Sequence, residues 1–146
     1  MSRPPPATRA AFRHFHPMPT RWMDNDVYGH VNNVVYYAWF DTAVNRFLID
    51  AGTLDIAASP TVGLVVETGC RYHASVTYPD TVEIGLRVAH LGTSSVRYEL
   101  AVFRDGEDRA SAEAHFVHVY VDRATQRPVP IPGNARAAMR GLMGDA

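Results

Sequence analysis

The chain has 146 residues, of which 47% are hydrophobic and 20% are charged, and its formal net charge is −1 at pH 7. This length suits one domain with an ordinary buried core, so we expect residues 1–146 to form a single domain. A net charge near zero gives no electrostatic basis for binding nucleic acid or an anionic membrane. All 14 basic residues are arginine and are spread along the chain, which favours a compositional bias over a phosphate-binding cluster.

The first residues predict neither a signal sequence nor an element of the fold. Residues 1–19 have no uninterrupted apolar run and no stretch of transmembrane length, so we expect no secretion and no membrane span. Pro4, Pro5 and Pro6 favour a loose segment, and we expect a flexible tail over residues 1–12. The single Cys70 cannot form an intramolecular disulfide, which suits a reducing compartment and predicts a cytoplasmic protein.

A strand is predicted after the tail, over residues 13–22. It contains Pro17 and Pro19, which cannot donate to a neighbouring strand and therefore place it at a sheet edge or at a bulge.

Polar residues then crowd the approach to an apolar helix. Residues 21–33 read Arg-Trp-Met-Asp-Asn-Asp-Val-Tyr-Gly-His-Val-Asn-Asn, and no charge follows until Asp41. This pattern predicts a buried helix over residues 34–51 that ends at Gly52. The paired asparagines could cap its first turn, where the helix dipole also places partial positive charge. Such a helix start can stabilise the oxyanion that develops during acyl transfer.

The second half of the chain predicts strands joined by hairpin turns. Apolar residues alternate with polar ones over residues 82–88, 96–102 and 112–120, and another strand is expected over 64–74. Turn residues at 92–94 and 105–106 predict antiparallel neighbours. An extended proline-rich segment at 128–132 precedes a short helix at 135–143. The predicted class is α+β, with the long helix packed on one face of an antiparallel sheet.

At residues 21–33 the chain resembles the acyl-CoA thioesterases of the 4-hydroxybenzoyl-CoA thioesterase-like group. The shared pattern is an Asp, then Gly-His-Val-Asn-Asn, then a Tyr and an acidic residue in the helix. The resemblance implies a hotdog fold, in which an antiparallel sheet wraps around a long central helix. It also implies acyl-CoA hydrolysis without a metal or other cofactor, in homodimers or homotetramers whose active sites lie between subunits.

The resemblance also suggests roles for individual residues. It implies that Asp26 is the catalytic carboxylate, as nucleophile or general base, and that the backbone N–H near Asn33 polarises the thioester carbonyl. His30 is expected to position the loop or the substrate. Residues expected to contact substrate are Tyr28, Asn32, Val34 and Glu67. Asp41 takes the acidic position of the helix, usually Glu, but Val44 stands where the group often has Arg, so the role of Asp41 stays open.

Structural roles compete with each of these assignments. Asp26 could serve only as a turn aspartate, His30 only as a loop hydrogen-bonding group, and the side chains of Asn32 and Asn33 only as helix caps. The spacing of Asp24, Asp26 and His30 matches no common metal-binding motif. The helix aromatics could line an acyl tunnel but more often fill a core. Four histidines on predicted strands are expected to be structural: His73, His90, His115 and His118.

Two other functions fit the same residues. A hydratase or dehydratase acting on acyl-CoA could use the same fold with a different acid–base pair. A domain that binds acyl-CoA without hydrolysing it is the second alternative. The sequence leaves open the acyl-chain preference, the choice between CoA and acyl-carrier protein, and which arginines contact CoA phosphates.

Overall fold

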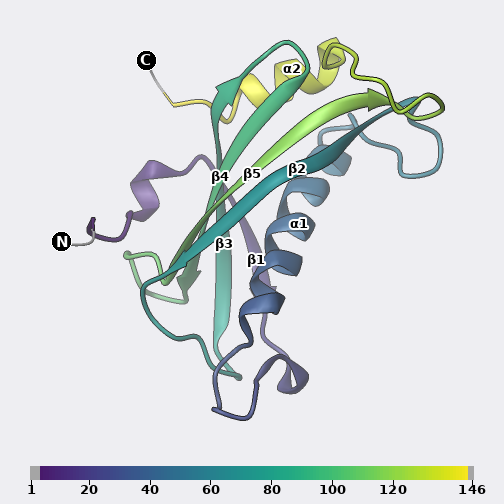
Figure 1. Cartoon of the computed structure of the whole chain (residues 1–146). Coiled ribbons are helices and arrows are strands. Elements are labelled where there is room, and N and C mark those ends of the chain that lie inside the picture. Colours follow the sequence, from purple (N-terminus) through teal and green to yellow (C-terminus); the bar gives the residue numbers. More distant parts are fainter. Residues whose placement is uncertain (1–3, 145–146) are drawn as a thin grey trace.

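The structure, a computed structural model, describes residues 4–144 (Figure 1). Its strands are β1 (His14–Pro19), β2 (Thr61–Tyr72), β3 (Thr81–Leu91), β4 (Ser95–Arg104) and β5 (Ala112–Asp122). Its helices are the long α1 (Asn33–Asp50), the short α2 (Gly133–Arg140) and two 3₁₀ turns, η1 (Arg9–Ala11) and η2 (Trp22–Asp24). All the predicted strands are present, with boundaries that differ by a few residues.

The strands form one antiparallel sheet in the order β1-β3-β4-β5-β2. Strands β3, β4 and β5 follow one another as hairpins, whereas β1 and β2 occupy the two edges. The edge position of β1 confirms the prediction from its prolines, because Pro17 and Pro19 pair with β3 on one side only. Strand β2 carries a bulge between Val65 and Glu67.

Helix α1 runs along one face of the sheet, and the main core lies between them (Figure 1). Its buried side chains are Tyr36, Trp39, Phe40, Ala43, Val44 and Leu48. They meet the inward rows of the strands, such as Ile84 and Leu100. The predicted α+β hotdog architecture, a sheet around a long helix, is therefore confirmed. No helix within residues 4–144 is long and apolar enough to cross a membrane.

The segment before β1 lies against the face of the sheet that points away from α1. Phe12 is buried and packs edge-on against Phe103, and the Ala7 carbonyl accepts a hydrogen bond from the Ala110 N–H at 2.9 Å. The expected flexible tail at residues 1–12 is thus held by a second, smaller apolar cluster over its later part. Residues 1–3 of that segment lie outside the described residues.

Candidate active site

The loop between β1 and α1 is anchored by Asp24. Its carboxylate is buried and accepts hydrogen bonds from the Arg21 backbone N–H at 2.8 Å and from the Arg21 guanidinium at 2.8 and 3.1 Å. The Asp24 carbonyl accepts a further bond from the Asn32 N–H at 2.8 Å. Asp24 thereby joins the beginning and the end of the loop, and its carboxylate is committed to structure.

Asp26 sits in a tight turn that presents its carboxylate at the surface of the loop. Its Oδ1 accepts a hydrogen bond from the Tyr28 N–H at 2.8 Å, and its backbone bonds to His30 and Gly29 close the turn. Gly29 has a φ of +81°, a conformation that side-chain-bearing residues rarely adopt. The Asp26 Oδ2 has no hydrogen-bond partner among residues 4–144, so one carboxylate oxygen is available for chemistry.

The start of α1 offers an unpaired backbone donor. The Asn32 side chain caps the helix by accepting from the Val34 N–H at 3.1 Å, and the Val35 N–H reaches the Asn32 carbonyl at 3.0 Å. The N–H of Asn33, the first helical residue, has no acceptor within the described part of the chain. The expectation that Asn32 caps the helix is met, and the N–H of Asn33 remains for a ligand.

A hollow of about 260 Å³ opens beside this donor. His30 and Asn33 both line it, together with Tyr72 and His73 from β2 and the segment that follows. Within one chain the structure therefore brings two of the three expected catalytic residues to one cavity. His30 is exposed and makes no hydrogen bond to the Asp26 carboxylate, so nothing in this arrangement shows it orienting that group.

The expected substrate-contacting residues fall in different places. Tyr28 and Val34 flank the loop and the helix start with 82% and 69% of their surface exposed. Glu67 lies on the far side of the sheet, where its carboxylate is 3.1 Å from His115 and 3.9 Å from Arg97. A single chain thus leaves Glu67 remote from the loop that carries Asp26.

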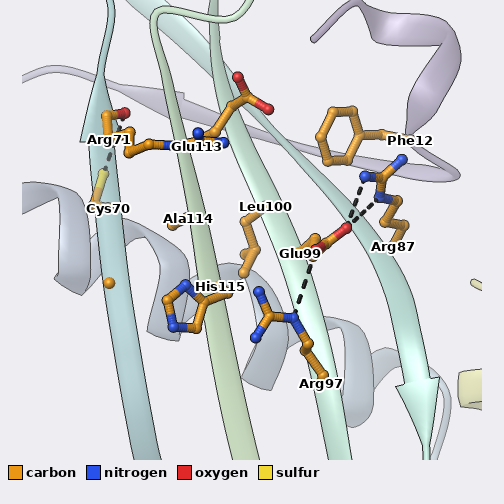
Figure 2. A pocket seen from close by; sticks show the side chains of 11 residues that line it. Phe12, Cys70, Arg71, Arg87, Arg97, Glu99, Leu100, Glu113, Ala114 and His115 are labelled. Atoms are coloured by element: carbon orange, nitrogen blue, oxygen red, sulfur yellow. Dashed lines mark hydrogen bonds and ion pairs between the residues drawn. The ribbon is translucent and has the colours of Figure 1, made fainter. Parts of the chain in front are cut away.

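The outer face of the sheet carries a larger hollow, of about 450 Å³. Figure 2 shows Arg87 and Arg97 both directed at Glu99, with Glu113 close to Arg71. Three arginines and three glutamates meet on this face when Glu67 is included. The lining of the hollow itself has these three arginines against two glutamates, Glu99 and Glu113.

The sequence analysis assigned no role to Tyr72 and expected His73 and His118 to be structural, but all three lie at or beside these cavities. Tyr72 donates its hydroxyl to the Asn33 carbonyl at 3.3 Å. His73 lines the small hollow and pairs with Glu113 at 2.8 Å. His118 is 3% exposed, and its Nε2 has no hydrogen-bond partner. Burial lowers the pKa of His118 to about 4, against an opposing effect of Asp41. Only His118 had a sequence signal, as a polar residue in the apolar row of β5.

A metal site is not formed by these groups. Among the residues that the structure describes, no three His, Cys, Asp or Glu side chains gather closely enough to hold a metal ion.

Comparison with known proteins identifies relatives along nearly the whole chain. The PA5185 protein of Pseudomonas aeruginosa is 54% identical, with a TM-score of 0.94, over 97% of this chain and 99% of that one. The PA2801 protein of the same organism is 32% identical, with a TM-score of 0.80, over 88% and 98%. The BH1999 gentisyl-coenzyme A thioesterase is 26% identical, with a TM-score of 0.77, over 86% and 99%. No curated protein matches the chain.

A family model completes the comparison. It is the model of the thioesterase-like superfamily, and it matches residues 20–139, a span that includes the Asp26 loop, all of α1 and four of the five strands. The chain therefore belongs to the thioesterase-like superfamily.

Proposed function

We propose that this protein hydrolyses acyl-CoA thioesters to a free acid and CoA. The observation that carries the proposal is the unpaired Asn33 N–H at the start of α1, beside a hollow and a few residues after the surface carboxylate of Asp26. A helix N-terminus favours developing negative charge. Membership of the thioesterase-like superfamily and similarity to a gentisyl-coenzyme A thioesterase support the same reaction class.

In the proposed reaction the thioester carbonyl oxygen accepts a hydrogen bond from the Asn33 N–H. As the tetrahedral intermediate forms, that oxygen becomes an oxyanion, and the N–H and helix dipole stabilise it more strongly than they stabilise the starting carbonyl. The C–S bond then breaks, and CoA leaves as a thiolate that takes up a proton.

Asp26 can supply the attacking oxygen by two routes. As nucleophile, its carboxylate forms a mixed anhydride with the acyl group, which water then hydrolyses. As general base, it removes a proton from a water molecule that attacks the carbonyl directly. The free Oδ2 suits both routes. Single turnover in ¹⁸O-labelled water separates them, because only the nucleophilic route can leave the label in the protein's own carboxylate.

We further propose that the active unit is a homodimer in which two β2 edges pair. The open edge of β2 exposes three consecutive apolar residues, Leu64, Val65 and Val66, at 41%, 45% and 60%. A long apolar edge strand is a template for pairing with another chain. A tetramer would need a further contact between two such dimers. A cytoplasmic location fits the lone free thiol of Cys70.

The test is thiol release from short, long and aromatic acyl-CoAs by the wild-type protein and by Asp26→Asn. The Asn side chain can still accept the Tyr28 N–H bond that closes the turn, so the variant should fold normally while its rate falls by about 10² to 10⁴. Asp50→Asn, at the exposed end of α1, is the matched control and should keep full activity.

Other results would redirect the assignment. Wild-type activity that persists in Asp26→Asn would contradict the role of Asp26. Thermal stabilisation by acyl-CoA without thiol release would favour a binding domain. Addition of water across an enoyl-CoA double bond, with the thioester intact, would favour a hydratase.

A further inference from the structure

A third cavity, of about 320 Å³, lies under the C-terminal half of α1. The apolar part of its lining comes from α1, the following loop, β2 and β5, and includes Leu48, Leu54, Ile56, Val62 and Tyr120. Arg123 closes one side by donating to the carbonyls of Ser59 and Ile56 at 2.7 and 2.9 Å. The cavity is thus a mostly apolar chamber, and the hydrogen bonds from Arg123 hold the loop that forms one of its walls.

His118 is the polar lining residue of this chamber that is almost fully buried. The residue is 97% buried, Nε2 is enclosed without a partner, and no described group bonds to Nδ1. The neighbouring Tyr98 ring lies edge-on to the imidazole at 5.4 Å, and its hydroxyl is also buried without a partner. Since Nε2 and the Tyr98 hydroxyl are sealed off, Nδ1, beside the lining residue Gly63, is the imidazole atom that a ligand in the chamber can reach. A hydrogen bond to Nδ1 would offset part of the cost of burying the ring.

Gly63 keeps the imidazole open to the chamber. A Cβ built at Gly63 would lie 3.3 Å from the Nδ1 of His118 and 3.4 Å from the Tyr120 ring. Both residues line the same cavity. Any side chain at position 63 would therefore occupy the space in front of the imidazole.

The charge state of His118 decides which ligand group can bind beside it. Burial lowers the pKa of His118 to about 4, so the ring is neutral at pH 7, with one nitrogen donating and the other accepting. The Asp41 carboxylate is the charged group that acts on it from α1. A neutral ring near a carboxylate does not compensate a buried anion. A hydroxyl can donate or accept, and so it satisfies either tautomer.

The proposed dimer brings this chamber to the reaction centre. Within one chain, α1 rises about 18 Å between Asn33 and Asn45, which borders the chamber. Antiparallel pairing of two β2 edges sets the Thr61 end of one strand beside the Tyr72 end of the other. Because Tyr72 holds the Asn33 carbonyl, the helix start of each copy comes next to the other copy's chamber.

We propose that this chamber is the acyl subsite and that His118 selects acyl groups carrying an uncharged hydroxyl over the same acyl groups without it. The inference rests on the proposed thioester hydrolysis and names its substrate class. His118 acts on specificity and takes no part in breaking the C–S bond.

The experiment measures kcat/KM for matched acyl-CoAs: hexanoyl, octanoyl, decanoyl and phenylacetyl, each with and without a hydroxyl at the far end. In the wild type, at least one hydroxylated member should exceed its plain partner by about tenfold, the worth of one good hydrogen bond. The His118→Phe variant should have similar kcat/KM values for the hydroxylated and the plain member of each pair. Gly63→Ala should reduce the preference by crowding Nδ1. His90→Phe, the same change on the exposed part of β3, should preserve it.

A second measurement keeps this inference separate from the proposed reaction. The same acyl-CoAs are added to the Asp26→Asn variant and to the Asp26→Asn/His118→Phe double variant. The shift in melting temperature that they cause reports binding without turnover. If the wild type releases no thiol, hydrolysis fails, yet a hydroxyl-dependent shift that His118→Phe abolishes still supports the subsite. No preference for any hydroxylated member, or a preference that survives in His118→Phe, would overturn the subsite whether or not hydrolysis occurs.

Discussion

The Tyr72 hydroxyl donates a hydrogen bond to the backbone carbonyl of Asn33 at 3.3 Å and so ties the end of β2 to the first residue of α1. Burial is the main cause that raises the pKa of Tyr72 above the usual value of about 10, so the hydroxyl stays a hydrogen-bond donor well into the alkaline range. The bond joins an edge strand to the helix start that carries the proposed oxyanion donor. The position of that donor therefore depends on β2 as well as on the preceding loop.

The Tyr72→Phe variant tests the role of this hydrogen bond. Loss of the hydrogen bond to Asn33 should lower the free energy of unfolding by about 1 kcal/mol, and loss of the hydroxyl's hydrogen bonds with Cys70 and Tyr37 should add to this. The rate should fall more than stability alone explains, roughly tenfold in kcat, because small displacements of positioned groups are costly in catalysis. Steady-state kinetics and thermal unfolding check both effects. Tyr78→Phe, which removes an exposed hydroxyl beside Trp22, is the control, and equal losses in both variants would contradict the positioning role.

The sequence predicted the elements well because their signals are local. Proline placed β1 at an edge, alternation located the strands, and Asn32 proved to be the helix cap. Relationships between distant residues had no such signal. Nothing in the order of residues shows that Tyr72 reaches Asn33, or that Glu67 points away from α1 after a bulge shifts the strand by one residue. One change of register reverses the face of a side chain, and sequence periodicity does not reveal it.

Asp24 and Asp26 are neighbours in the loop, and the structure predicts opposite effects for them. The Asp24→Asn change replaces a buried carboxylate with a neutral amide, and that carboxylate holds Arg21 through three hydrogen bonds. We expect it to destabilise the fold by about 1 to 3 kcal/mol, with activity falling only as far as the folded fraction falls. Chemical denaturation and kinetics on each variant check this. A stable Asp24→Asn protein without activity would show that Asp24 has a catalytic role.

His118 should make the protein sensitive to mild acid. Its pKa is about 4 in the folded chain against 6.5 for an ordinary histidine, so only the unfolded chain takes up a proton between these values. Stability is complete above about pH 6.5 and falls as the pH approaches 4, by about 3 kcal/mol from this group.

His118→Phe isolates this effect. The variant should lose that part of the acid sensitivity and should be at least as stable as the wild type at pH 7, since it removes a buried polar atom without a partner. Denaturant unfolding at pH 4.5, 5.5 and 7 gives the comparison. Parallel pH curves for the two proteins would mean that the pKa of His118 is the same in the folded and unfolded chain.

The last prediction concerns the exposed edge of β2 and the assembly of two chains. Val66→Lys places a charge in the middle of the apolar run from Leu64 to Val66, and a lysine on an edge strand opposes pairing with another chain. The variant should be monomeric by light scattering, with its own fold intact, because Val66 is exposed in the single chain. Its activity should fall together with the dimer fraction, since in the proposed dimer the start of α1 in one copy adjoins the chamber of the other. The Ala89→Lys change, at an exposed position of β3, is the control for adding a charge away from this edge. A monomeric Val66→Lys protein with full activity would show that one chain holds a complete site, and it would remove the geometric basis for placing the acyl group beside His118 of the second copy.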